Sequence, residues 1–141
     1  MIRVSTLQLV QQLQSGALSA RFLTEQCLAT IEQRNPILNA FVLVDAERAL
    51  KKADDIDARR SAGQSVGPMA GLPFAVKDNI CVTGMRTTCG SRILNNFVPP
   101  YDAHVIERLE ASDGILIGKL NQDEFAMGSS TETSIFGAGR N

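Results

Sequence analysis

The chain has 141 residues, of which 44% are hydrophobic and 21% charged, a balance typical of globular domains rather than of disordered or fibrous proteins. Fourteen basic residues against fifteen acidic ones leave a net charge of −1, which gives no electrostatic drive toward nucleic acid or acidic membranes. No apolar run is long enough to span a bilayer and no secretory signal is evident, so we predict a cytosolic protein.

The first part of the chain is predicted to be helical. Helices are expected to begin after Ser5, Ser19 and Asp45, whose side chains can accept hydrogen bonds from the first free backbone N–H groups. The second helix is expected to end at Asn35-Pro36, because proline lacks an N–H group and clashes with the preceding turn. An extended segment over residues 40–44 separates the second helix from the third.

The third predicted helix carries seven charged side chains, which we interpret as a solvated face: Lys51, Lys52, Asp54, Asp55, Asp57, Arg59 and Arg60. Residues 63–68 (GQSVGP) follow as a turn-rich joint. We place a boundary there, between an N-terminal helical region, residues 1–66, and the first part of an α/β domain, residues 67–141. The second part is not expected to be an independent domain.

Short apolar runs dominate after the joint. Residues 72–76 and 115–117 have the length and content of buried strands, and residues 80–82 could form a further short strand. Asp102 is expected to cap a helix that ends at Gly114. Strand, helix and strand in this order predict the α/β class, with a mixed, mainly parallel sheet that is incomplete at residue 141.

Cysteine and histidine chemistry is disfavoured. The three cysteines, Cys27, Cys81 and Cys89, are odd in number and widely spaced, which predicts reduced thiols and no metal site. A cysteine nucleophile needs a basic partner, and the single histidine, His104, falls in a predicted helix. A pair of glycosidase carboxylates is also poorly supported, because the neighbours Asp123 and Glu124 would not share one face of a helix.

Lys77 is the side chain best placed for chemistry. It directly follows an apolar strand, where burial would disfavour its charged form, lower its pKa and let it act as a base near neutral pH. A lysine at a strand end is also commonly a surface residue whose amine reaches water, so the position alone decides little. Asp78 and Asn79 are interpreted as turn residues rather than as groups that orient the lysine.

Four ordered blocks resemble the amidase-signature family. They are residues 71–80 (GLPFAVKDNI), 84–91 (GMRTTCGS), 99–103 (PPYDA) and 123–132 (DEFAMGSSTE). Within the family, the similarity is greatest to the glutamine-hydrolysing subunits of glutamyl-tRNA(Gln) amidotransferases. The resemblance implies a Ser, cis-Ser, Lys triad, in which an unprotonated lysine, here Lys77, activates a nucleophilic serine through a bridging serine.

The resemblance also assigns the residues around the base. Met127, Gly128, Ser129 and Ser130 would line the substrate site, while packing and turn-forming roles stay open for them. Both triad serines lie in a later block of the family that this chain does not contain. The chain alone is therefore expected to be inactive.

Glutamine is the implied substrate, and the implied partners are the B and C subunits of the amidotransferase, with glutamyl-tRNA(Gln) held mainly by the B subunit. ATP and Mg²⁺ would be used by the partner, with no cofactor or metal bound by this chain. Two alternatives stay open: a fragment of a stand-alone amidase, or a non-catalytic remnant that acts as a binding or assembly piece.

Overall fold

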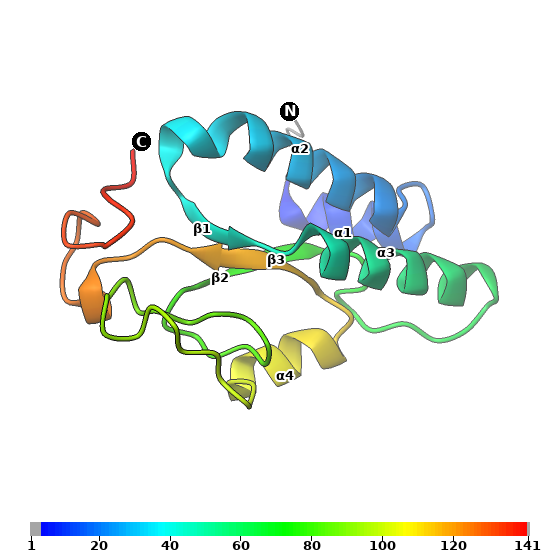
Figure 1. Ribbon diagram of the computed structural model, residues 1–141. Helices are drawn as coiled ribbons and strands as arrows, with labels where there is room; N and C mark the ends of the chain where they lie inside the picture. The colour runs from blue at the N-terminus through cyan, green and yellow to red at the C-terminus, as the bar shows by residue number, and fades with distance from the viewer. Residues whose placement is uncertain (1–3, 141) are drawn as a thin grey trace. The chain divides into compact units, whose positions relative to one another are not determined.

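The computed structural model describes residues 4–140. These residues form four α-helices, a small sheet and one 3-10 turn, which confirms the α/β class. In chain order (Figure 1) the elements are α1 Thr6–Gln14, α2 Ala20–Leu38, β1 Phe41–Val44, α3 Ala46–Ser61, β2 Pro73–Lys77, α4 His104–Ala111, β3 Ile115–Leu120 and η1 Glu124–Ala126.

The sheet is mixed and has the order β1-β3-β2. β1 pairs antiparallel with β3, with Phe41 opposite Leu120 and Val44 opposite Gly118. β2 runs parallel to β3, because a backbone hydrogen bond joins Leu72 to Ile115 at one end and another joins Asp78 to Leu120 at the other. The predicted strand, helix, strand unit is therefore present as β2, α4 and β3.

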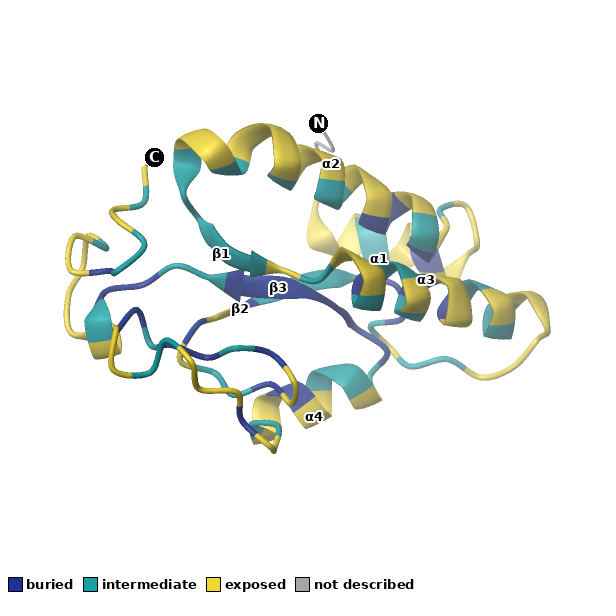
Figure 2. Cartoon of the chain, in the orientation of Figure 1, coloured by how far each residue is buried: buried dark blue, intermediate teal, exposed yellow. Residues whose placement is uncertain are grey.

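β3 is the buried centre of this sheet (Figure 2), and five of its six residues are buried. The expected strand at residues 80–82 is wrong, because the chain there forms only an isolated bridge between Val82 and Met85. Among residues 4–140, no helix is long and apolar enough to cross a membrane.

The predicted helix starts are confirmed after Ser5, Ser19 and Asp45. Ser5 forms a capping box with Gln8, and the Asp45 carboxylate accepts from the backbone N–H of Arg48. The predicted end of α2 is wrong, since the helix runs through Pro36 to Leu38. The helix ends where Asn39 takes the left-handed conformation, with φ of 51°, and donates from its N–H to the Asn35 carbonyl at 2.8 Å. The Asn35 side chain accepts from two backbone N–H groups of the next segment, at 2.9 and 2.7 Å, and so holds the chain that leaves the helix.

Asp102 does not cap α4. Its carboxylate instead accepts from the backbone N–H of Thr83 at 2.6 Å, so it fixes a loop rather than a helix start. At the other end of α4 the left-handed position is taken by Asp113, with φ of 61°, rather than by Gly114. His104 lies in the first turn of α4, in a helix as predicted, and its side chain is 82% exposed.

The chain divides into two compact units, each made from three stretches. One unit contains the residues up to Thr30, then Asp45–Phe74 and Arg108–Ile117, and the other contains Ile31–Val44, Ala75–Glu107 and the residues from Gly118 onward. The predicted division at residues 66 and 67 concerns the order of elements along the chain and stays a prediction.

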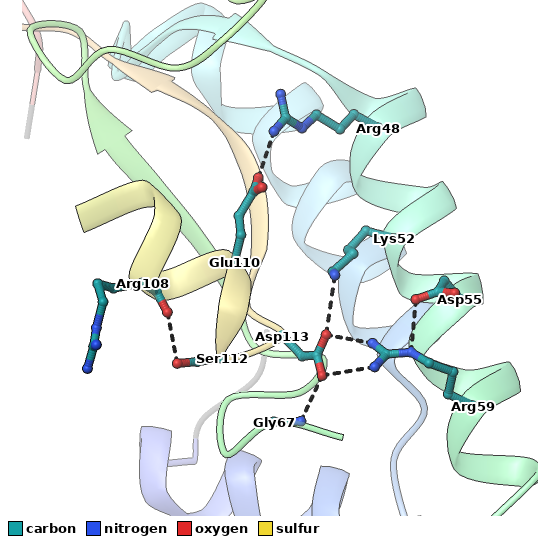
Figure 3. A network of polar contacts seen from close by, with 9 residues as sticks. All are labelled: Arg48, Lys52, Asp55, Arg59, Gly67, Arg108, Glu110, Ser112 and Asp113. Carbon is teal, nitrogen blue, oxygen red and sulfur yellow. Dashed lines mark hydrogen bonds and ion pairs between the residues drawn. The ribbon is translucent and has the colours of Figure 1, made fainter. Parts of the chain in front are cut away.

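The first unit contains a network of ion pairs that the sequence did not predict (Figure 3). Asp113 is 7% exposed and accepts from Arg59, from Lys52 and from the backbone N–H of Gly67. Burial alone would raise the pKa of Asp113, but these hydrogen bonds outweigh it and lower the pKa to about 2. The solvated face expected of α3 is therefore wrong at Lys52 and Arg59.

Asp57 is a second exception on the same helix. Its two carboxylate oxygens accept from the backbone N–H groups of Ala20 and Arg21, both at 2.9 Å, and so cap the start of α2. This long-range cap adds to the predicted local one, in which Ser19 accepts from the N–H of Phe22 at 3.1 Å.

Candidate active site

Lys77 is the last residue of β2 and marks the carboxyl end of the parallel strand pair. The neighbouring Val76 is buried, but Lys77 itself is exposed, so the expected burial of its amine is not provided by the residues described. Among these residues, no hydrogen bond or ion pair is formed by its ammonium group. Its backbone carbonyl accepts from the N–H of Ile80 at 3.0 Å, which confirms a turn directly after the strand.

The backbone and the carboxylate of Asp78 both have hydrogen-bond partners, and the residue is almost completely buried, at 1% exposure. One carboxylate oxygen accepts from the Lys119 ammonium at 3.1 Å, and the other accepts from the backbone N–H of Thr88 at 3.0 Å and from its hydroxyl. The backbone N–H donates to Leu120 and the backbone carbonyl accepts from Cys89. The prediction of Asp78 as a turn residue is therefore confirmed, and its side chain in addition belongs to a buried ion pair that the sequence did not predict.

Lys119 is the buried lysine of this chain and has no exposed surface. Besides Asp78, its ammonium donates to the Thr87 hydroxyl at 2.8 Å and reaches the Arg86 carbonyl at 3.5 Å. Sequence reasoning missed it because the strand was expected to stop at Ile117. The available signal was a single charged residue inside an apolar run that resumes at Leu120.

The loop that contacts this pair is held in an uncommon backbone conformation. Cys89 and Gly90 both have positive φ, and a Cβ atom on Gly90 would lie 2.8 Å from the Gln122 carbonyl oxygen. The Thr88 hydroxyl also accepts from the N–H of Gly90 at 3.0 Å. Burial and the charge of Asp78 raise the pKa of the Cys89 thiol, which opposes the thiolate form that a nucleophile needs.

All three cysteines are free, and the described residues contain no cluster of histidine, cysteine and acidic side chains that could hold a metal ion. The side chain of Gln122 is buried, and neither its nitrogen nor its oxygen has a hydrogen-bond partner within residues 4–140.

The segment after β3 is organised by Asp123. Its carboxylate accepts from the backbone N–H groups of Ser130 at 3.1 Å and Thr131 at 2.9 Å, and from the hydroxyl of Thr133 at 3.0 Å. These hydrogen bonds, the one from Thr131 first, lower the pKa of Asp123. Gly128 packs directly on this carboxylate, because a Cβ there would clash with the Asp123 side chain.

The four residues assigned to the substrate site follow one another along this loop but differ in setting. Ser129 and Ser130 line a hollow of about 390 Å³ together with Asn121, Thr131 and Arg140, among others. Met127 is 79% exposed. Their contact with substrate stays a prediction.

Two backbone hydrogen bonds link this loop to the lysine end of β2. The N–H of Cys89 donates to the carbonyl of Asp78 at 3.2 Å, and the N–H of Phe125 donates to the carbonyl of Cys89 at 2.8 Å. Asp78, directly after Lys77, and Phe125, in the turn before Met127, are thus both hydrogen-bonded to Cys89. Because both follow carboxyl ends of parallel strands, they share the edge of the sheet where ligands of α/β proteins commonly bind.

The chain is similar to a large group of known proteins. Residues 22–141 match the family described as Amidase. The A subunit of the glutamyl-tRNA(Gln) amidotransferase from Synechococcus sp. (strain CC9605) is 57% identical over 131 residues, and that from Symbiobacterium thermophilum is 53% identical over 128 residues. The alignments cover 93% and 90% of this chain but only 27% and 26% of those relatives, so the chain spans about a quarter of their length.

Solved structures give the same picture of the fold. A chain described under a vestigial protein complex and the evolutionary origins of an s-triazine catabolic enzyme has a TM-score of 0.93 and 40% identity. The match covers 98% of this chain and 30% of that one. The A subunit of the glutamyl-tRNA(Gln) amidotransferase of Thermotoga maritima has a TM-score of 0.69 and 37% identity, and this match covers 86% of this chain and 24% of that one.

Proposed function

The chain belongs to the amidase-signature family, and we propose that the complete protein is the glutamine-hydrolysing A subunit of a glutamyl-tRNA(Gln) amidotransferase. The observation that carries this proposal is the 57% identity to such a protein over 131 residues. Several relatives that bear the same name are between 49% and 57% identical. The match concerns about a quarter of those proteins, so the activity of the whole is our inference.

In the proposed reaction, glutamine and water give glutamate and ammonia. Lys77 is the base that takes a proton, through a bridging serine, from a serine that attacks the amide carbonyl. Both serines belong to a part of the protein outside this chain. The position of Lys77 at the carboxyl edge of the parallel strands supports this role, because that edge is where active sites of α/β proteins gather.

A neutral lysine needs shelter from water. Lys77 is exposed among the described residues, so the shelter has to come from the remaining three quarters of the protein. The ammonia would then pass to the B and C subunits, which amidate glutamyl-tRNA(Gln) with ATP and Mg²⁺. This chain alone, without the serines, is expected to be inactive.

The test is glutaminase turnover of the complete protein with Lys77→Ala. We expect the release of ammonia from glutamine to fall by at least about 10³-fold, because an acyl transfer loses its base. Lys51→Ala, at an exposed lysine of α3, is the matched control and should keep normal turnover. A Lys77→Ala enzyme with normal turnover would show that Lys77 is not the base.

A stand-alone amidase is the second candidate. It is favoured by the similarity to a bacterial aryl acylamidase, with 29% identity and a TM-score of 0.90, and to a peptide amidase, with 31% identity and a TM-score of 0.78. Supplying the complete protein with either glutamine or simple aryl and peptide amides separates the two candidates. Preference for glutamine, together with amidation of glutamyl-tRNA(Gln) in the presence of the partner proteins, supports the amidotransferase.

A further inference from the structure

Both polar groups of the peptide bond between Lys77 and Asp78 are hydrogen-bonded within their unit. The N–H of this peptide, which belongs to Asp78, donates to Leu120 at the end of β3, and its carbonyl, from Lys77, accepts from Ile80. The Asp78 carbonyl accepts from Cys89, and its carboxylate is bound by Lys119 and Thr88. The proposed base is therefore attached to a residue whose backbone and side chain are both hydrogen-bonded.

Stability is a poor explanation for this arrangement. Burying an ammonium and a carboxylate costs several kcal/mol of solvation for each ion, and well-packed apolar residues often replace such pairs without loss. Lys119 and the Asp78 side chain are 0% and 2% exposed, so this cost applies in full. The pair does fix the orientation of both side chains, because the Lys119 ammonium also donates to Thr87 and the Asp78 carboxylate also accepts from Thr88.

We propose that the buried Asp78–Lys119 ion pair is a positioning device for Lys77. It ties the carboxyl ends of β2 and β3 to the loop of Thr87 and Thr88, and so fixes the backbone from which the Lys77 amine reaches its proton donor. The inference rests on the proposed function of Lys77 as the base. Asp78 and Lys119 act through Lys77 and have no contact with substrate in this role.

The experiment compares three variants of the complete protein with glutamine as substrate. Asp78→Asn combined with Lys119→Met removes both charges and leaves no ion unpaired, and Asp78→Asn alone removes only the carboxylate charge. Thr88→Val removes one hydroxyl from the Asp78 carboxylate and keeps the side-chain shape. The double variant should lose at least about tenfold in kcat, because moving a catalytic group by about 1 Å can slow a reaction by up to about 10²-fold. KM for glutamine should change by less than about twofold.

Thr88→Val decides the question if the charge variants fail to fold. We expect a smaller loss of kcat, about threefold or more, again with little change in KM. The matched control is Asp113→Asn, which breaks a buried carboxylate network in the other unit of the chain. It should lower the melting temperature while the folded enzyme keeps its kcat.

The outcomes separate this inference from the proposed function. If Lys77→Ala keeps its turnover, the proposed function fails and the positioning role fails with it. If Lys77→Ala is inactive but Thr88→Val and every folded charge variant keep normal kcat, only the positioning role is overturned. Loss of kcat in the Asp78 series, without the same loss in Asp113→Asn, establishes it.

Discussion

Buried or nearly buried carboxylates hold the loops of this chain at three places, Asp78, Asp113 and Asp123. Each accepts from at least one backbone N–H group as well as from side chains. Backbone donors in loops have no regular partner, so a carboxylate that satisfies them fixes the loop conformation. The residue types were visible in the sequence, but their partners lie 10 or more residues away for Asp78 and 46 for Asp113, and no local pattern predicts such pairs.

Asp113→Asn should destabilise the protein in a pH-dependent way. The pKa of Asp113 is about 2 in the folded protein and about 3.9 in an unfolded chain, so the folded state favours the charged form. A lowered pKa contributes stability above the unfolded value, and this is lost as pH falls from about 4 toward 2. We expect a stability difference of about 2 kcal/mol at pH 7, measured by denaturant unfolding of both proteins.

Below about pH 3 the two unfolding curves should approach one another. Asparagine tolerates the positive φ of 61° at this position, so the substitution tests the charge rather than the backbone. A difference that stays constant from pH 7 to pH 3 would show that the ion pairs of Asp113 contribute no net stability.

Among the helices, local signals predicted the starts after Ser5, Ser19 and Asp45 but not the start of α4, where Asp102 binds the loop at Thr83. Ser5 and Asp45 cap their own helices, which is why sequence reasoning found them. Pro36 was expected to end α2, but the helix continues to Leu38 and ends where Asn39 takes the left-handed conformation. The strand ending expected at Ile117 failed because Lys119 is paired inside the protein, which no hydrophobic pattern shows.

The contact between β1 and β3 depends on a glycine. A Cβ atom on Gly118 would lie 2.1 Å from the carbonyl oxygen of Leu43, a distance that backbone atoms cannot accommodate without moving apart. Gly118→Ala should therefore open this antiparallel pair and destabilise the protein by about 2 kcal/mol or more, measured by thermal unfolding.

Gly63→Ala is the control for this prediction. Gly63 follows α3 with open space around it, so alanine there costs only backbone strain from its positive φ, about 1 kcal/mol. Equal melting temperatures for the two variants would mean that the sheet accepts a side chain at Gly118.

At the scale of the whole molecule, the chain is about a quarter of the relatives that it matches. Four motif blocks in order sufficed to predict the family, which the match over residues 22–141 confirms. The setting of Lys77 could not be predicted in the same way: it was expected to be buried, and it is exposed among residues 4–140.

In the proposed mechanism Lys77 is an uncharged amine in the complete protein, sheltered by residues outside this chain. Competitive labelling of lysines with acetic anhydride over a range of pH tests this directly, because only neutral amines react and the pH dependence of each rate does not depend on how easily the reagent reaches the amine. We predict that the labelling of Lys77 reaches its maximum rate at a pH at least about one unit lower than the labelling of the exposed Lys51 in the same sample. The same pH dependence for both lysines would show that Lys77 is an ordinary charged residue and would contradict its assignment as the base.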